Sequence, residues 1–390
     1  MEAVDEERAA HGRGVVCYDF LYCRGGAEHV TLTLAAAIPG TDVCVGFRNP
    51  EAFTEQDLQD LRCIELGRMP RIRFGAWRTA SGLGLFARRA RCLAGYDWAV
   101  FSGSNAPVAV RHRSAGGNVY YCHTLPRFAY DLRDYYLATL PLWRRPAFEA
   151  MSAAVRALFE AAVRRMDVIV ANSENVRRRI QRYLGLDARV VYPPCDVSGY
   201  RWLGQDDYYL SAARLESYKR VDLAVRAFLR MPDKRLVVAS GGSQLARLQR
   251  LANGASNIVF VGWLDGVRLR ELVGRAIATL YLARDEDFGI APVESMAAGK
   301  PVIGVAEGGL LETVLPGSTG ILLPPEPEVD DVVSAVRAMS PEAAAAMRAA
   351  CEERARAFDT PRFVAGMRAA IEQARACGRA HRRAALAGGA

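Results

Sequence analysis

Lysine is scarce in this chain of 390 residues: Lys219, Lys234 and Lys300 are the only lysines among 51 basic residues. The nine cysteines are scattered and form no Cys-x-x-Cys pair, which excludes the spacing of a zinc ribbon or a disulfide framework. We therefore expect free thiols in a reducing cytoplasm. No run of about 18 uninterrupted apolar residues occurs, so we expect no transmembrane helix. Four acidic residues among the first seven are unlike a secretory signal.

The positive charge is concentrated in one segment. The formal net charge is +8, and residues 68–113 hold nine arginines against one acidic residue, Asp97. This composition indicates an anionic partner, either a phosphate-bearing acceptor, an anionic membrane surface or nucleic acid. A solvated arginine-rich face is an equally good interpretation in an arginine-biased chain. Apolar side chains are interleaved with these arginines and favour a membrane surface: Phe74, Trp77, Leu83, Leu85 and Phe86.

Short apolar runs alternate with helical stretches in both halves of the chain. The first half has runs such as Gly14–Tyr18 and Trp98–Phe101, and the pattern restarts after Pro193-Pro194 with Tyr208–Ser211. Buried strands separated by helices predict the α/β class, with parallel, doubly wound sheets. We expect two Rossmann-like domains facing each other across a cleft, at residues 1–196 and 197–358. Residues 359–390 are expected to form a helix that packs back toward the first domain and ends in a frayed tail.

Two segments join a strand to a helix with groups suited to an anionic ligand. Gly25 and Gly26 lie between the first strand and the next helix, where glycines let the backbone approach a ligand closely. A plain tight turn explains the same pair. Arg214 and Lys219 follow the strand Tyr208–Ser211, and two cations there can clamp a diphosphate. The alternative for Lys219 is a surface ion pair with Glu216 or Asp222.

A third segment, Glu286–Glu294, places two carboxylates eight residues apart around a glycine-containing turn. We expect Glu286 in the loop at a strand end and Glu294 in the first turn of the following helix, where the helix dipole favours an anion. Such a pair suits a polyhydroxylated ligand, and backbone amides of the turn can bond its hydroxyls. The alternative is a helix-capping acid beside a surface acid.

One histidine also lies directly after a predicted strand. His123 follows the strand Asn118–Cys122, and the carboxyl ends of parallel strands are where α/β sheets bind ligands. A structural histidine with satisfied hydrogen bonds is the alternative.

Together these segments resemble a retaining glycosyltransferase of the two-Rossmann-domain (GT-B) type, glycosyltransferase family 4. Glu286–Glu294 matches the E-x7-E motif of that family, and Arg214 with Lys219 matches its diphosphate clamp. Tyr192–Asp196 and Glu307–Val314 resemble its Y-P-P-x-D and G-G-x-x-E segments. The resemblance covers about residues 14–375. It is closest to the O-antigen mannosyltransferase branch, although Leu125 separates His123-Thr124 from the proline that usually follows directly.

The resemblance implies a role for each matched residue. Glu286 would bind hydroxyls of a donor hexose, Glu294 the nucleotide ribose, and Arg214 and Lys219 the departing diphosphate, while His123 would contact the sixth hydroxyl of the sugar. All of these except Glu294 are the expected catalytic residues. Further donor contacts would come from six residues: Gly25, Gly26, Asp287, Phe288, Gly289 and Ile290. The acceptor side would hold five: Arg127, Asp131, Arg88, Arg89 and Arg91.

The implied activity is retaining, front-face transfer of a hexose, mannose from GDP-mannose, to a glycan, a glycolipid or another hydroxyl acceptor. We expect neither a cofactor nor a metal ion, because fixed cations and helix amides can stabilise the leaving phosphate. The implied partners are the nucleotide-sugar, the acceptor and an anionic membrane surface, with the protein in the cytoplasm and peripheral at the inner face of the membrane. The oligomeric state stays open.

Four alternatives differ from this assignment. A transferase using a UDP- or dTDP-sugar on a small molecule, or a sugar-nucleotide epimerase or phosphorylase, is compatible with the same architecture. A binding protein with a dead site is disfavoured because all the matched charged positions are filled. A nucleic-acid binder is disfavoured because no helix-turn-helix, RNA-recognition or zinc-finger pattern occurs.

Overall fold

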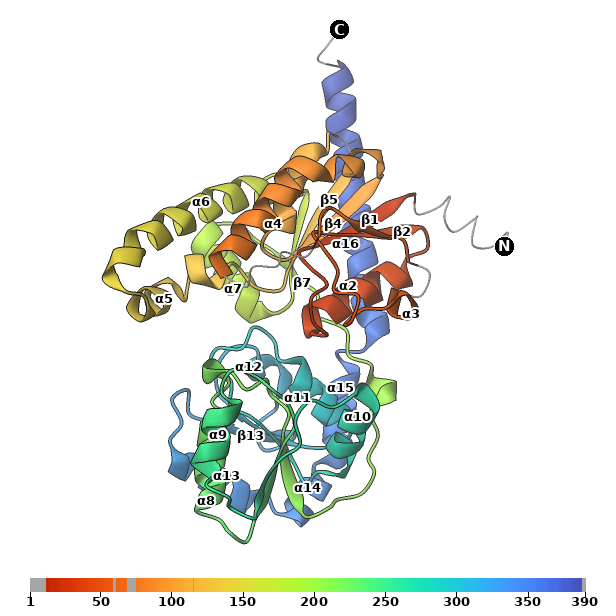
Figure 1. The fold of residues 1–390 in the computed structure, drawn as a ribbon. Helices are drawn as coiled ribbons and strands as arrows, with labels where there is room; N and C mark the ends of the chain where they lie inside the picture. The colour runs from red at the N-terminus through yellow and green to blue at the C-terminus, as the bar shows by residue number, and fades with distance from the viewer. Residues whose placement is uncertain (1–11, 59–60, 69–74, 115, 388–390) are drawn as a thin grey trace. The chain divides into compact units, whose positions relative to one another are not determined.

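A computed structural model describes residues 12–58, 61–68, 75–114 and 116–387, with side chains described except at 75–81 and 381–387 (Figure 1). The chain divides into two compact units. Residues 1–191 and 364–390 form the N-terminal unit, and residues 192–363 form the C-terminal unit.

The N-terminal unit is built on a seven-stranded parallel sheet with the order β3-β2-β1-β4-β5-β6-β7. The strand order reverses between β1 and β4, where Gly14 lies opposite Trp98. A Cβ atom on Gly14 would lie 1.9 Å from the Trp98 indole, so only glycine leaves room for this buried ring. The strands are β1 (Gly14–Tyr18), β2 (Thr41–Val45), β3 (Cys63–Glu65), β4 (Trp98–Ser102), β5 (Gly117–Cys122), β6 (Val168–Ala171) and β7 (Arg189–Val190).

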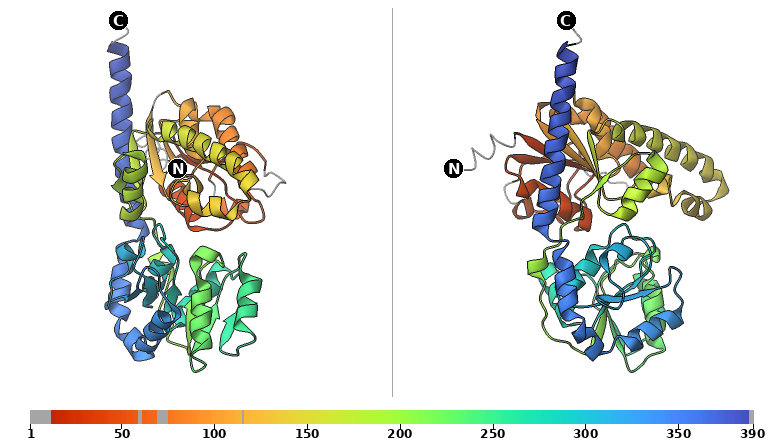
Figure 2. Two further views of the ribbon diagram at one scale, coloured as in Figure 1. Left: turned by 90° about the vertical axis from the view of Figure 1, so that its left-hand side faces the viewer. Right: turned by 180° about the vertical axis from the view of Figure 1, so that it is seen from behind.

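Helices cover this sheet and link its strands (Figures 1 and 2). The α-helices are α2 (Gly26–Ala37), α3 (Glu55–Leu58), α4 (Gly75–Arg89), α5 (Arg133–Thr139), α6 (Arg145–Val163) and α7 (Glu174–Leu184). Short 3₁₀ turns complete the connections: η1 (Ala90–Gly95), η2 (Ala106–His112), η3 (Arg127–Ala129) and η4 (Leu142–Arg144).

The last helix, α16 (Thr360–Ala387), begins in the C-terminal unit and continues as part of the N-terminal unit. There it packs against the start of β5, because Gly378 and Gly117 let the two backbones approach closely. Arg368 also donates a hydrogen bond to the carbonyl of Ala37, at 2.9 Å. The helix is regular through residues 376–387, where the sequence analysis expects a frayed tail, and residues 388–390 lie outside the described part.

The C-terminal unit repeats the topology with six parallel strands in the order β10-β9-β8-β11-β12-β13. Its order reverses between β8 and β11, where Leu210 lies opposite Thr279. The strands are β8 (Tyr208–Ser211), β9 (Arg235–Val238), β10 (Ile258–Phe260), β11 (Thr279–Tyr281), β12 (Val302–Val305) and β13 (Gly320–Leu323). Its helices are η5 (Val197–Gly199), η6 (Ser217–Lys219), α8 (Val221–Leu229), α9 (Leu245–Ala252), α10 (Gly266–Arg275), α11 (Ile290–Ala297), α12 (Leu310–Thr313), α13 (Val329–Ala338), α14 (Pro341–Ala346) and α15 (Arg348–Arg356).

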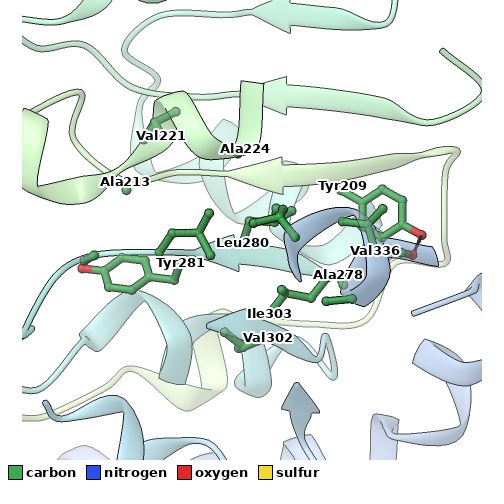
Figure 3. Packing of buried hydrophobic residues seen from close by; sticks show 14 of the residues in the cluster. Tyr209, Ala213, Val221, Ala224, Ala278, Leu280, Tyr281, Val302, Ile303 and Val336 are labelled. Atoms are coloured by element: carbon green, nitrogen blue, oxygen red, sulfur yellow. Dashed lines mark hydrogen bonds between the residues drawn. The ribbon is translucent and has the colours of Figure 1, made fainter. Parts of the chain in front are cut away.

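An apolar core fixes α8 and α13 against the centre of this sheet. Figure 3 shows Leu280 of β11 and Ile303 of β12 in the same cluster as Tyr209, whose phenol reaches toward Val336 of α13. The Tyr209 hydroxyl donates to the carbonyl oxygens of Val336 and Met339, at 3.2 and 2.7 Å. The buried phenol therefore satisfies its own polar group and also two carbonyls near the end of α13. The α/β prediction with two doubly wound domains is confirmed.

Lys300, one of the three lysines, has a structural role in the C-terminal unit. Its side chain is buried with Nζ 3.3 Å from the centre of the Trp202 ring, and it donates a hydrogen bond to the carbonyl of Gly204. Burial and the nearby Arg348 guanidinium lower the pKa of Lys300 to about 7. Lys300 thus ties the segment that leads into β8 to the body of the C-terminal unit.

Among the described residues, no helix combines the length and the apolar character that crossing a bilayer requires.

Candidate active site

The centre of the candidate site is a buried ion pair at the switch point of the C-terminal sheet. Lys219 ends η6 after β8, and Glu286 follows β11, the neighbour of β8 in the sheet. The Lys219 ammonium donates to Glu286 Oε2 at 2.5 Å, and the two side chains are only 7% and 20% exposed. Lys219 therefore does not form the alternative surface pair. Glu216 instead accepts hydrogen bonds from the amide and hydroxyl of Ser243.

A tyrosine that the sequence analysis missed completes this centre. Lys219 Nζ also donates to the Tyr281 hydroxyl at 3.0 Å, and Tyr281 is the last residue of β11 (Figure 3). Burial opposes the charge of Lys219, yet its hydrogen bonds to Tyr281 and Glu286 and the negative charge of Glu286 raise its pKa above the ordinary value. Burial and Glu286 likewise raise the pKa of the Tyr281 phenol. Lys219 is thus a fixed cation and Tyr281 a neutral phenol.

The turn after Lys219 is held by the segment that resembles G-G-x-x-E. Arg220 has a left-handed backbone conformation, with φ of 50°, and its guanidinium pairs with Glu307 and donates to the carbonyl of Pro325. A Cβ atom on Gly308 would lie 2.3 Å from the Glu286 carbonyl oxygen, and the amide of Gly309 donates to that oxygen at 2.8 Å. The paired glycines let this segment support the loop that carries Glu286.

The loop between Glu286 and α11 is anchored by its aromatic side chain. Phe288 is buried and lies 5.5 Å from the Tyr192 ring and 5.4 Å from the Phe358 ring, measured between centroids. Its side chain thus belongs to the core, so only its backbone can serve a ligand. None of the described residues accepts a hydrogen bond from the backbone amides of Phe288, Gly289 or Ile290. These amides precede or begin α11, where the helix dipole favours an anion.

Glu294 lies one turn further into its helix than the sequence analysis expects. Gly289 has φ of 87° and caps α11, so the helix begins at Ile290 and Glu294 falls in its second turn. Burial raises the pKa of Glu294, while the Tyr200 phenol and Arg270 oppose this effect. Arg214 is exposed in the loop between β8 and η6, and Asp287 is half-buried beside Glu286.

The N-terminal unit presents neutral polar groups at its strand ends. His123 follows β5 and lies between two aromatic rings, 5.0 Å from Tyr121 and 6.3 Å from Tyr18. Burial lowers the pKa of His123 to about 4, so the imidazole is neutral near pH 7. Its Nε2 and the hydroxyl of Thr124 are shielded from solvent and have no hydrogen-bond partner among the described residues. Buried polar groups without partners are the exception in folded proteins, which favours a ligand here over a satisfied structural histidine.

A half-buried aspartate that was not predicted from the sequence connects the ends of the two strands at the switch point. Asp19 follows β1, and its carboxylate accepts hydrogen bonds from the backbone amides of Ser104, Asn105 and Ala106, at 2.7 to 2.8 Å. Burial raises the pKa of Asp19, and these hydrogen bonds partly offset the effect. Two features of the sequence could have predicted this contact. Asp19 directly follows one strand, and the segment Ser104–Pro107, which leads into η2, follows another.

The other expected residues of this unit lie at three separate places. Gly25 caps α2 in an extended conformation, and both Gly25 and Gly26 are exposed. Arg127 and Asp131 form an ion pair at 2.7 Å, so each already compensates the charge of the other. Arg88, Arg89 and Arg91 are exposed at the end of α4 and the start of η1.

The apolar residues among the arginines correct one expectation. Leu83 and Phe86 are buried in the core of the N-terminal unit, and Leu85 packs against that core. They lie on the inner face of the amphipathic helix α4 and cannot offer an apolar surface beside the arginines. Phe74 lies outside the described residues, as does the side chain of Trp77.

Acidic residues flank Glu286 on both sides, since Asp285-Glu286-Asp287 has Asp-x-Asp spacing. Nowhere in the described ranges do three His, Cys, Asp or Glu side chains gather as they would around a metal ion.

Two family models match consecutive parts of the chain. The model "Glycosyltransferase Family 4" matches residues 24–198, and "Glycosyl transferases group 1" matches residues 199–358. The alpha-1,3/1,6-mannosyltransferase ALG2 of Rhizomucor pusillus is 30% identical to this chain over 192 residues. The match covers 36% of this chain and 42% of that protein. The chain spans about two fifths to one half of the length of the first curated relatives that it matches.

Solved structures share the whole fold. Sucrose-phosphate synthase from Thermosynechococcus elongatus has a TM-score of 0.75 at 19% identity, covering 96% of this chain and 100% of that one. Anabaena HepE, in complex with UDP and glucose, has a TM-score of 0.71 at 15% identity, covering 93% and 100%. The chain thus has the fold of the GT-B glycosyltransferases. Within that class, the chain belongs to glycosyltransferase family 4.

The buried ion pair should show up in a double-mutant cycle of stability. Lys219→Met leaves the Glu286 carboxylate withdrawn from water without its cation and should cost about 1–3 kcal/mol of unfolding free energy. Adding Glu286→Gln should recover part of that loss, because the uncompensated charge is gone. Urea unfolding measures all variants, with Lys234→Met as the matched control within about 0.5 kcal/mol of the parent. Additive effects of the two substitutions would contradict the pair.

The lowered pKa of His123 predicts a pH dependence of stability. The unfolded chain binds a proton near pH 6.5 and the folded chain only near pH 4, so stability falls as the pH drops through this interval. Between pH 7.5 and 5.5 the parent should lose about 1 kcal/mol more than His123→Gln. Denaturant unfolding at both pH values tests this, and equal losses in the two proteins would show that His123 titrates normally.

Proposed function

We propose that this protein transfers a hexose, mannose from GDP-mannose, to a hydroxyl acceptor with retention of configuration. The observation that carries the proposal is the Lys219–Glu286 pair at the switch point of the C-terminal sheet, where doubly wound folds bind nucleotides. Retaining transfer passes through a cationic sugar and a leaving diphosphate that gains negative charge. A fixed cation beside a carboxylate complements both species.

Each residue of this centre has one task in the proposed reaction. Lys219 exchanges its hydrogen bond with Glu286 for one with the leaving phosphate, and the exposed Arg214 adds a second positive charge. The amides of Phe288, Gly289 and Ile290 stabilise the same anion or bind sugar hydroxyls. Glu286, released from Lys219, binds hydroxyls of the hexose, and Glu294 binds the ribose. The leaving phosphate accepts the proton of the acceptor hydroxyl, so no protein base is needed.

His123 is assigned to the sixth hydroxyl of the sugar. Its neutral imidazole can donate or accept one hydrogen bond, and its Nε2 has no partner among the described residues. A neutral group binds a hydroxyl without placing a positive charge beside the cationic transition state.

The choice of sugar rests on resemblance. The branch that the sequence resembles most and the relative ALG2 are both named as mannosyltransferases. The second candidate is a UDP-sugar, because Anabaena HepE shares the fold and its structure has been solved in complex with UDP-glucose. The acceptor is proposed to be a glycan or a lipid-linked sugar at an anionic membrane surface, with Arg88, Arg89 and Arg91 exposed on the N-terminal unit. The protein would then be peripheral at the cytoplasmic face.

Thermal shift with a panel of donors tests the assignment. GDP-mannose and GDP should raise the melting temperature of the parent, because a ligand that binds only the folded state stabilises it. UDP- and dTDP-sugars at equal concentration should have little effect. Lys219→Met should lose most of the shift and Lys234→Met should keep it. A larger shift with UDP-glucose would replace the proposed donor by the second candidate.

Metal independence is the second test. The positive charge that the leaving diphosphate needs is supplied by Lys219, Arg214 and backbone amides, so transfer should continue in excess EDTA. Initial rates with and without EDTA measure this. Loss of activity that Mg²⁺ or Mn²⁺ restores would show that Asp285 and Asp287, at their Asp-x-Asp spacing, recruit a metal ion with the donor.

A further inference from the structure

The turn between α5 and α6 carries large apolar side chains that the rest of the unit leaves uncovered. Leu142 and Trp143, both in η4, are 75% and 73% exposed, and Tyr135 and Tyr136 of α5 are 55% and 40% exposed. Figure 1 and the right-hand view of Figure 2 place α5 and the start of α6 at the outer end of the N-terminal unit, away from its sheet. We call Tyr135, Tyr136 and residues 142–145 the η4 tip.

The charge of the η4 tip is positive. Residues 140–148 contain Arg144 and Arg145 and no acidic residue. The Arg144 guanidinium lies over the Trp143 ring, 4.5 Å from its centre, and Arg145 donates to the carbonyl of Leu140 at 3.3 Å. The acids on either side are already engaged, because Arg133 pairs with both Asp134 and Glu149. The two arginines beside Trp143 are therefore not neutralised by these acids.

This combination fits a lipid surface better than a protein surface. Tryptophan and tyrosine prefer the headgroup level of a bilayer, and arginine contacts lipid phosphates while its stem lies along apolar surface. A two-fold contact between two copies would bring Arg144 and Arg145 close to their own symmetry mates, and like charges at that distance repel. Anionic lipid headgroups complement both the charge and the apolar side chains.

We propose that the η4 tip docks the protein on a bilayer containing anionic lipids, with Leu142 and Trp143 entering the headgroup region. The proposal rests on the peripheral location in the proposed function and places it at this tip instead of at the arginines of residues 68–113. Docking at the η4 tip would also bring the bilayer close to the segment that holds two of the expected acceptor-side residues. The segment before α5 holds Arg127 and Asp131, and the amide of Leu132 donates to the carbonyl of Arg127 at 2.8 Å.

Vesicle co-sedimentation of the full chain tests the docking. The parent should bind vesicles of phosphatidylcholine with about 30% phosphatidylglycerol at low salt, and bind less at high salt or without the anionic lipid. Leu142→Ser/Trp143→Ser and Arg144→Glu/Arg145→Glu should each weaken this binding at least about tenfold. The matched control is Trp263→Ser, because Trp263 is 69% exposed in the C-terminal unit. It should bind as the parent does.

A triple variant at the end of α4 and a thermal-shift measurement distinguish the possible results of the vesicle experiment. Arg88→Glu/Arg89→Glu/Arg91→Glu should bind vesicles within about twofold of the parent; if it alone loses binding, the docking surface is the end of α4 and the proposal fails. It also fails if the parent ignores anionic vesicles, or if the η4-tip variants bind unchanged or lose a dimer seen by light scattering. Thermal shift with GDP-mannose on the same proteins tests the donor separately, since η4-tip variants should keep that shift whether or not vesicles bind.

Discussion

The buried positive charge of Lys219 constrains the chemistry of the C-terminal unit. The Lys219 ammonium is nearly removed from water, so it must have a carboxylate and hydrogen-bond acceptors within reach. Both come from the end of β11, which lies beside β8 only because the strand order reverses there. The loop with Glu286 is in turn held by the glycines at 308 and 309, and the turn with Lys219 by the pairing of Arg220 with Glu307.

The two units use one topology for different electrostatics. At the switch point of the C-terminal sheet stands a lysine–glutamate pair with a phenol. At the switch point of the N-terminal sheet stands Asp19, whose carboxylate is satisfied by backbone amides, and His123 at the end of the next strand is neutral. The C-terminal switch point thus carries a charged pair, whereas the N-terminal unit carries a carboxylate satisfied by backbone amides and a neutral imidazole.

The sequence predicts those features that depend on local periodicity and spacing. Nearly all central strands were found because they are short, apolar runs, and Lys219 and Glu286 were found because each follows such a strand. The edge strand β3 has only three residues, which are half-buried or exposed, so no apolar run marks it in the sequence. The helix start at Ile290 was missed because it depends on the left-handed Gly289.

Other features depend on contacts between distant residues. In the sequence, Tyr281 looks like an ordinary apolar strand residue. Its hydroxyl accepts a hydrogen bond from Lys219 only because η6 lies close to the end of β11. The apolar residues of α4 were assigned to a surface because their arginine neighbours dominate the composition. In the folded unit the helix turns Leu83 and Phe86 inward and the charges outward.

The preference for arginine over lysine has a practical consequence for spectroscopy. The N-terminal unit contains no lysine at all, and two of the three lysines in the C-terminal unit are buried. An amine-reactive dye therefore finds Lys234 as its one accessible lysine side chain in this protein, besides the amino terminus. Lys234 lies in the turn before β9, and its carbonyl is fixed by the side-chain amide of Asn257. A single probe can thus be attached to the C-terminal unit without introducing a cysteine among the nine already present.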